Sequence, residues 1–297
     1  MLVIGLFGPT ASGKSDIAAA VTELIPAEVV SADAMQVYDG LPILTNQSPK
    51  PERLVGIWPL SHVASVGEYA PLAHAAIDEI LAAGRIPLVA GGTGLYFRAA
   101  LAELDLPPAP LPGARERWER LYDEDGSRAA HARLGELDPL AAARVHPNDR
   151  RRVVRALELA DSGRSLVPRR DNLFGGAWRH PTLLIGLDLP KPELDRRIAE
   201  RTRRMFEVGV EEEVRGALLA EPSATARKVI GLDEVATLPL EEAVTAVTAR
   251  TRRYAAYQRK WLRRLEGLVI VATDRPPEEI AAEIVALART RERLPRP

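Results

Sequence analysis

A glycine-rich segment near the N-terminus has residue types and spacing suited to holding phosphate. Its residues fit the pattern G-x-x-x-x-G-K-[ST]: Gly8, Pro9, Thr10, Ala11, Ser12, Gly13, Lys14 and Ser15. Glycines let the backbone wrap so that N–H groups point at phosphate oxygens, and a helix N-terminus adds partial positive charge. We expect Lys14 to neutralise a terminal phosphate and the Ser15 hydroxyl to ligate Mg²⁺.

Two further segments carry groups that could act on a ligand of this loop. Asp33 follows one predicted strand, and Thr93 follows another within Gly91–Gly94. The carboxyl ends of parallel strands border the ligand crevice, so Asp33 could serve as a base there, and Thr93 offers a hydroxyl that flanking glycines leave accessible. Taken alone, Asp33 is equally typical of a helix cap or of a residue that holds magnesium through water, and Thr93 of a strand-to-helix turn.

The elements that must position these residues alternate between strands and helices. An apolar run over 2–7 ends at Gly8, and a helix is expected over 14–24. Further strands are predicted at 28–31 and 86–90, with an amphipathic helix over 68–83 between them. This alternation predicts an α/β fold with a parallel sheet.

The pattern changes after residue 106. Residues 106–113 contain four prolines and read as a connector, and residues 114–163 are predicted to be helical throughout. A loop is expected over 165–181. The α/β pattern then resumes. Strands are predicted at 182–188 and 268–272, and helices at 190–208, 209–220 and 239–265, with a last helix that starts near 274–279. We therefore expect a core of 1–110 and 181–297 and a helical insertion of 111–180.

Composition excludes several classes of protein. The 297 residues are 46% hydrophobic and 27% charged, which is typical of a globular chain. The chain has no cysteine, and its five histidines lack paired metal-ligand spacing, so thiol chemistry and a zinc site are not expected. It has no run of eighteen apolar residues and no basic, cleavable leader, so we expect a cytoplasmic protein without membrane contact.

Positive charge is concentrated in two places although the net charge is −1. One cluster is Arg150–Arg152 with Arg155. The other, with no acidic residue between its members, contains Arg250, Arg252, Arg253, Arg259, Lys260, Arg263 and Arg264. Such clusters are typical of solvated helix faces. They also suit binding of a polyanion, because the local electrostatic field, and not the net charge of the protein, decides such binding.

Three motifs read together resemble the tRNA dimethylallyltransferase family. They are Gly8–Ser15, Ser31–Tyr38 and Gly84–Phe97, in this order and spacing. The similarity continues through Ala141–Asp149, Arg155–Glu158, Arg197–Arg201, Thr251–Tyr254 and Gln258 with Trp261, and so covers essentially the whole chain. It implies a P-loop NTPase-like parallel sheet flanked by helices, with an all-helical insertion domain.

The resemblance also implies an activity. The family transfers a dimethylallyl group from dimethylallyl diphosphate to N6 of the adenosine immediately 3′ of the anticodon, which gives N6-isopentenyladenosine. By this resemblance Lys14, Ser15 and the loop amides hold the donor's diphosphate with Mg²⁺, in a loop of the ATP-binding type, and Arg201 joins them. Asp33 matches the family's general base, and Thr93 matches its threonine beside the reacting groups.

The resemblance further implies a set of residues that contact the anticodon stem-loop. They are Asp33, Ala34, Met35, Gln36, Thr93, Arg115, Arg151, Arg152, Arg155, Arg227, Lys228, Gln258, Arg259, Trp261 and Arg263. The chain departs from the family's usual residues at 41–47, 232–233 and 256–257, and the last two departures remove positive charge from expected RNA contacts. A monomer is expected.

Other functions compatible with these residues stay open. A P-loop kinase of a small metabolite would use Asp33 as the base for a hydroxyl. An adenylate isopentenyltransferase would prenylate a free nucleotide, although a nucleotide needs no basic surface of this size. A nucleotide-dependent RNA-binding module without catalysis would not need Lys14, Ser15 and Asp33 together.

Overall fold

The computed structural model describes residues 2–167 and 177–291. Its internal contacts divide the chain into two compact units. The core unit comprises Met1–Glu103 and Leu173–Pro297, and the helical unit comprises Leu104–Asn172. The expected insertion, 111–180, overlaps most of this helical unit. Each unit is described by itself below.

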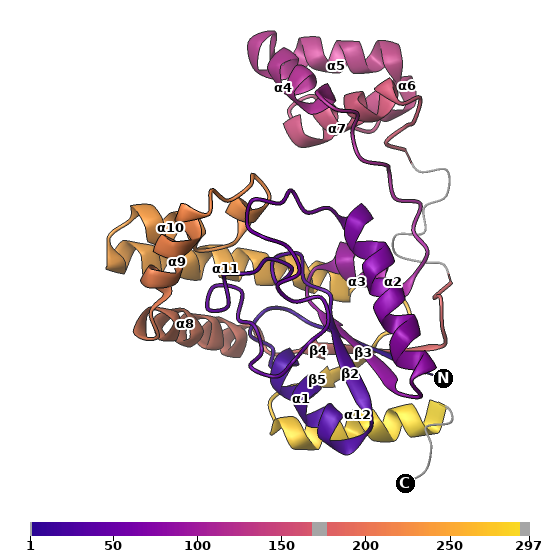
Figure 1. The fold of residues 1–297 in the computed structure, drawn as a ribbon, viewed down its shortest axis with the longest axis vertical. Coiled ribbons are helices and arrows are strands. Elements are labelled where there is room, and N and C mark those ends of the chain that lie inside the picture. Colours follow the sequence, from indigo (N-terminus) through magenta and orange to yellow (C-terminus); the bar gives the residue numbers. More distant parts are fainter. Residues whose placement is uncertain (1, 168–176, 292–297) are drawn as a thin grey trace. The chain divides into compact units, whose positions relative to one another are not determined.

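Five parallel strands form the sheet of the core unit (Figure 1). They are β1 (Val3–Phe7), β2 (Ala27–Ser31), β3 (Ile86–Gly91), β4 (Thr182–Asp188) and β5 (Val269–Ala272). The order across the sheet is β2-β3-β1-β4-β5, and all four pairings are parallel. The predicted α/β fold with a parallel sheet is confirmed.

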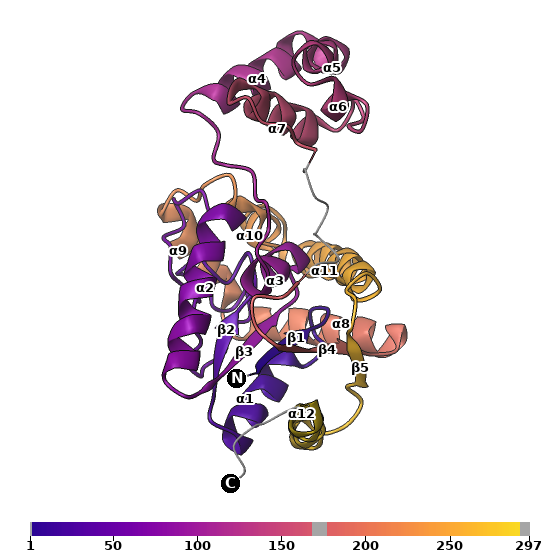
Figure 2. The same cartoon turned by 90° about the vertical axis from the view of Figure 1, so that its right-hand side faces the viewer.

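Helices cover both faces of this sheet (Figure 2). On one face, α1 (Lys14–Leu24) and α12 (Pro277–Arg291) pack against Ile4 and Leu6 of β1. On the other, α2 (Val66–Ala82) and α3 (Gly94–Leu101) pack against Val3 and Phe7. Because side chains alternate along a strand, the continuous apolar run of β1 serves both layers.

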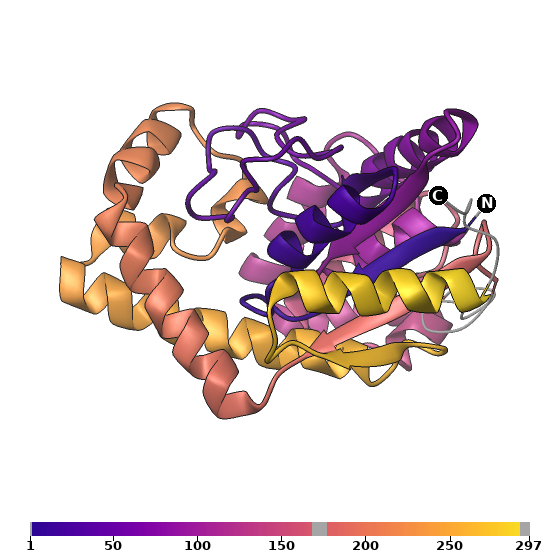
Figure 3. The same cartoon turned by 90° about the horizontal axis from the view of Figure 1, so that it is seen from below.

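The remaining helices of the core unit gather at one end of the sheet (Figure 3). They are α8 (Lys191–Glu207), α9 (Val210–Leu219), the 3-10 turn η1 (Ala226–Lys228), α10 (Leu232–Thr237) and α11 (Leu240–Leu262). Helices α8, α9 and α11 confirm the predictions, but α3, α10 and η1 were not predicted. Nearly every residue of α3 is buried, so its sequence has no amphipathic period to reveal a helix.

The described part of the helical unit, up to residue 167, has four helices rather than one continuous helical stretch. They are α4 (Ala114–Glu124), α5 (Gly126–Leu137), α6 (Pro139–Ala142) and α7 (Arg150–Asp161). The prediction for 114–163 was therefore wrong in its continuity. The direction of the chain changes between α4 and α5 at Asp125 and at Gly126, the first residue of α5, which has a φ of 86°; the carboxylate of Asp149 caps the N-terminus of α7. The predicted loop over 165–181 falls mainly outside the described residues.

Each unit has its own apolar core. That of the helical unit is built from Trp118, Ala130, Leu134, Val153 and Leu157.

Among the described residues, no helix combines the length and apolarity needed to cross a bilayer.

Candidate active site

A cavity of about 720 Å³ lies in the core unit, where the phosphate loop and the segment after β2 meet α8 and α11. Residues predicted from four separate segments of the chain line it together: Lys14, Ser15, Asp33, Gln36, Arg201 and Gln258. The expected crevice at the carboxyl ends of the strands is therefore present. Leu44, Met205, Val229 and Val247 add apolar wall to the same cavity.

The phosphate loop has the strained backbone of a built anion site. It connects β1 to α1, and Gly13, at φ 87°, occupies the left-handed region that favours glycine. Ala11 also has a positive φ, of 63°, which is unfavourable for alanine and is held by the surrounding loop. Lys14 Nζ donates hydrogen bonds to the carbonyl oxygens of Gly8 at 2.9 Å and Pro9 at 2.7 Å. The loop thus wraps around its own lysine.

Two partly buried cations, Lys14 and Arg201, line the cavity together with Asp33. Burial lowers the pKa of Lys14 to about 8; Asp33 opposes that shift and Arg201 adds to it. Burial likewise lowers the pKa of Arg201 to about 10, again opposed by Asp33. Within the described structure, Arg201 Nε and Ser12 Oγ are buried without a hydrogen-bond partner. Two desolvated cations and an unpaired donor suit a multiply charged anion such as diphosphate.

The residues beside Lys14 also fit Mg²⁺. Ser15 lines the cavity, and the described residues contain no cluster of three or more His, Cys, Asp or Glu that could hold a metal alone. Mg²⁺ keeps several waters and binds through substrate phosphates with one or two protein ligands. A single hydroxyl next to a diphosphate site is therefore a sufficient protein contribution, and Ser15 is the residue that would provide it.

Asp33 is held at the cavity wall by its own backbone turn. Its Oδ1 accepts a hydrogen bond from the Met35 N–H at 2.9 Å. The neighbouring Ala34 N–H donates to Thr93 Oγ1 at 3.2 Å, and Thr93 Oγ1 lies 3.1 Å from the hydroxyl of Tyr254. Thr93 thus joins the segment that carries Asp33 to helix α11.

Gln258 connects the phosphate loop to the end of β3. Its Oε1 accepts from the Thr10 N–H at 2.8 Å, and its Nε2 donates to the Gly92 carbonyl at 3.0 Å. A Cβ at Gly92 would lie 2.2 Å from Gln258 Nε2, and one at Gly94 would lie 2.0 Å from the Trp261 ring. The close approach expected at these glycines is used by the side chains of Gln258 and Trp261.

Comparison with known proteins identifies the family. The sequence profile described as IPP transferase matches residues 36–265. A tRNA dimethylallyltransferase of Thermobifida fusca is 41% identical over 88% of this chain and 87% of its own length. One of Anaeromyxobacter dehalogenans is 41% identical over 96% and 99%. This chain belongs to the IPP transferase family.

Solved structures agree with this assignment. The tRNA isopentenylpyrophosphate transferase of Bacillus halodurans is 29% identical, with a TM-score of 0.69 over 97% of this chain and 95% of that chain. The Staphylococcus epidermidis enzyme is 27% identical, with a TM-score of 0.69 over 98% and 99%. A eukaryotic dimethylallyltransferase, at 23% identity and a TM-score of 0.78, shares the fold. The P-loop NTPase-like class predicted from the sequence is confirmed.

In this IPP transferase, predicted RNA contacts of the core unit occupy three kinds of place. Met35 and Gln36 line the cavity. Arg227 and Arg259 lie beside Asp233 and Asp188, at 3.5 and 2.9 Å. Arg263 is exposed at the end of α11, whereas Trp261 is only 7% exposed and packs in the core. The placement of Trp261 gives it a packing role that the sequence did not indicate.

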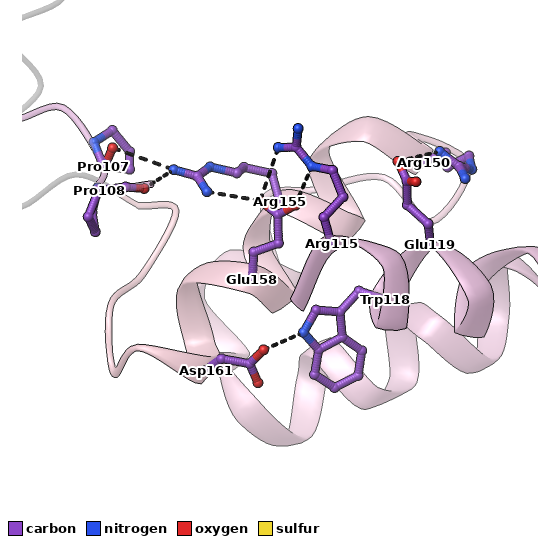
Figure 4. Close-up of polar contacts among 9 residues, drawn as sticks. All are labelled: Pro107, Pro108, Arg115, Trp118, Glu119, Arg150, Arg155, Glu158 and Asp161. Carbon is purple, nitrogen blue, oxygen red and sulfur yellow. Dashed lines mark hydrogen bonds and ion pairs between the residues drawn. The ribbon is translucent and has the colours of Figure 1, made fainter. Parts of the chain in front are cut away.

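Two predicted RNA contacts of the helical unit share one buried carboxylate (Figure 4). The side chain of Glu158 has no exposed surface. Arg115 Nε donates to its Oε1 at 2.7 Å, and Arg155 Nη1 donates to its Oε2 at 2.9 Å. Arg155 also donates to the carbonyl of Pro108 in the connector. The hydrogen bond that Arg115 donates to Glu158 raises the pKa of Arg115, and the shared carboxylate fixes both arginines in position.

The first basic cluster is divided between paired and exposed arginines. Arg150 forms ion pairs with Asp123 and Glu119 on α4. Arg151 and Arg152 are exposed in the first turn of α7, and Arg152 also has an ion pair with Asp149, at 3.7 Å. Exposed arginines retain the charge that attracts a polyanion, so these two are the better phosphate-binding candidates of the cluster.

Sequence reasoning missed the roles of Glu213 and Tyr254. Glu213 accepts hydrogen bonds from the backbone N–H groups of Ile43 and Leu44, at 2.6 and 2.8 Å, and burial raises its pKa. It therefore anchors the 41–47 segment, which borders the cavity. Tyr254 lies within a stretch that resembles the family, but only the fold shows which groups the two residues contact.

Proposed function

We propose that this protein transfers a dimethylallyl group from dimethylallyl diphosphate to N6 of the adenosine immediately 3′ of the anticodon in tRNA, with N6-isopentenyladenosine as the product. Its similarity to proteins named tRNA dimethylallyltransferase supports the proposal. The observation that carries it is the cavity that Lys14, Arg201 and Asp33 line together, where the carboxylate of Asp33 favours the charged form of both cations.

The cationic half of the cavity suits departure of diphosphate. When the carbon–oxygen bond of the donor breaks, negative charge grows on the diphosphate oxygens. Loop N–H groups, Lys14 and Arg201 are fixed before the reaction, so they stabilise this charge without reorganisation. A bound Mg²⁺, held on the protein side by Ser15, would supply additional charge neutralisation.

Asp33 suits the proton transfer that the acceptor requires. The exocyclic amine of adenine is a weak nucleophile because its lone pair is delocalised into the ring. As N6 forms its bond to the prenyl carbon, one N6 proton passes to the carboxylate of Asp33, and the electron pair of the broken bond leaves with diphosphate. The hydrogen bond from the Met35 N–H fixes the orientation of this carboxylate.

Recognition of tRNA is assigned to the remaining predicted residues. The target adenosine must leave its stack to reach Asp33, and Met35 and Gln36 are placed on the cavity wall to meet it. Arg151 and Arg152 suit phosphates of the anticodon stem-loop. The proposal includes a monomeric protein that works in the cytoplasm.

A transfer assay tests this function. Purified protein is incubated with Mg²⁺, labelled dimethylallyl diphosphate and either unmodified tRNA, AMP or ATP. Label in tRNA alone is expected. Label in AMP or ATP alone would identify an adenylate isopentenyltransferase. Absence of prenyl transfer together with phosphorylation of a metabolite by ATP would replace the proposal with a kinase.

A further inference from the structure

The hydroxyl of Tyr254 belongs to none of the groups predicted from the sequence, yet it contacts the site. Tyr254 lies on α11 one turn before Gln258 and lines the same cavity. Its hydroxyl lies 3.1 Å from Thr93 Oγ1, which also accepts a hydrogen bond from the Ala34 N–H. Ala34 directly follows Asp33, so this chain of contacts leads from α11 to the expected base.

The hydrogen-bonding capacity of a hydroxyl limits what Thr93 can do. Its oxygen has two lone pairs and its single proton can serve one acceptor. The Ala34 N–H can only donate, so it occupies one lone pair. If Thr93 gave its proton to Tyr254, none would remain for a substrate. If Tyr254 donates instead, both lone pairs are filled and the Thr93 proton is free for a third partner.

The surroundings favour Tyr254 as a donor. Burial raises the pKa of its hydroxyl, and the negative charge of Asp33 raises it further. Tyr254 therefore keeps its proton throughout the range in which proteins are stable. Thr93 is only partly buried and, although it is not itself among the residues that line the cavity, both Asp33 and Tyr254 beside it are.

We propose that Tyr254 is a positioning residue: its hydroxyl donates to Thr93 Oγ1, and so directs the proton of Thr93 toward an acceptor atom of the bound substrates while holding the Ala34–Asp33 backbone beside it. This inference rests on the proposed prenyl transfer. It assigns Tyr254 an effect on kcat through Thr93, and none on the binding of the prenyl donor.

The variant Tyr254→Phe removes only the hydroxyl. Losing one net hydrogen bond predicts a roughly tenfold fall in kcat for tRNA prenylation, with KM for dimethylallyl diphosphate unchanged. A matched control is Tyr38→Phe, because Tyr38 is also buried and its hydroxyl donates to a threonine, Thr225 Oγ1, at 2.6 Å, but neither residue lines the cavity. This control is expected to lower the melting temperature and leave kcat unchanged.

A double-mutant cycle with Thr93→Val shows whether Tyr254 acts through Thr93. The tenfold effect of Tyr254→Phe is expected to disappear in the Thr93→Val background, since the hydroxyl that it directs is gone. Melting temperatures of all variants, measured without substrate, report any loss of folding separately.

The outcomes separate this inference from the proposed function. A wild-type protein that prenylates no acceptor contradicts both. An active wild type with an unchanged kcat in Tyr254→Phe contradicts only the role of Tyr254. The same holds if the effect of Tyr254→Phe is as large in the Thr93→Val background as in the wild type.

Discussion

Lys14 is the residue whose environment gives the clearest dependence on pH. In the free protein, burial lowers its pKa to about 8. A bound diphosphate favours the protonated ammonium and so raises that pKa. At a pH between the pKa of Lys14 in the free protein and its pKa in the complex, binding of diphosphate takes up a proton. The affinity for inorganic diphosphate is therefore highest below about pH 8 and falls as the pH rises above it.

Calorimetry in two buffers of different ionisation heat measures this proton uptake. When diphosphate binds, we expect Lys14 to take up nearly one proton at about pH 9 and almost none at about pH 7. Lys14→Arg keeps the charge but stays protonated at both values, so its uptake should be absent. Equal uptake in the wild type and the arginine variant would show that another group titrates.

Asp33 carries the predicted acid–base role at the same scale. Asp33→Asn keeps the shape of the side chain but cannot accept a proton from N6. We expect kcat to fall by a factor of about 100 or more, the contribution typical of a general base. Binding of dimethylallyl diphosphate, measured by calorimetry, should persist. A variant that retains most of its kcat would show that water or another group takes the proton.

At the scale of elements, Glu158 joins α7 to α4 through Arg115 and to the connector through Arg155. Removing a buried carboxylate leaves two arginines without their counter-charge, so Glu158→Ala should destabilise the helical unit by about 3 kcal/mol. Hydrogen exchange of the α4 and α7 amides measures this free energy of opening.

Glu136→Ala provides a control for this prediction in the same unit. Glu136 pairs with Arg133, and both side chains are about half exposed or more, at 64% and 48%. Loss of such a surface pair should change the opening free energy by less than about 1 kcal/mol. Equal effects of the two substitutions would mean that Glu158 has no special structural role.

The elements themselves were predictable where local patterns determine them. The bounds of α1 and β4 were predicted to the residue, because a phosphate loop opens the first and a continuous apolar run forms the second. Helix α3 was missed because burial on all sides removes the amphipathic period. The breaks between α4, α5, α6 and α7 depend on packing within the helical unit, so composition predicted helical structure throughout 114–163 without these breaks.

The site was predictable in part for the same reason. Lys14, Ser15 and Asp33 follow strands, and a parallel sheet brings strand ends together whatever the side chains do. The contact of Arg115 with Glu158, and that of Tyr254 with Thr93, join residues far apart in the sequence. Such tertiary contacts leave no periodic signal.

At the scale of the whole molecule, net charge is nearly zero, so local arginines must attract the RNA. Binding of tRNA should weaken steeply with salt, because bound phosphates release counterions, whereas binding of AMP should change far less. In filter binding, the double variant with Arg151→Ala and Arg152→Ala should reduce the steepness of this salt dependence. The slope of the logarithm of the tRNA association constant against the logarithm of the salt concentration should become smaller in magnitude by about 2. Arg133→Ala, which removes an arginine already paired with Glu136, should leave it unchanged.

An unchanged slope in the Arg151 and Arg152 variant would remove the first turn of α7 from the RNA-binding surface. A slope reduced equally by Arg133→Ala would show that any loss of positive charge from the helical unit has this effect, and that no particular pair of arginines is responsible.

The position of the modification tests the central claim most directly. Unmodified tRNA is treated with the protein, Mg²⁺ and dimethylallyl diphosphate, digested with a nuclease of known specificity, and the fragments are analysed by mass spectrometry. We predict an added prenyl group on N6 of the adenosine immediately 3′ of the anticodon, and none with Asp33→Asn on the same timescale. A prenyl group on another nucleotide, or unaltered tRNA beside a prenylated free nucleotide, would contradict the account.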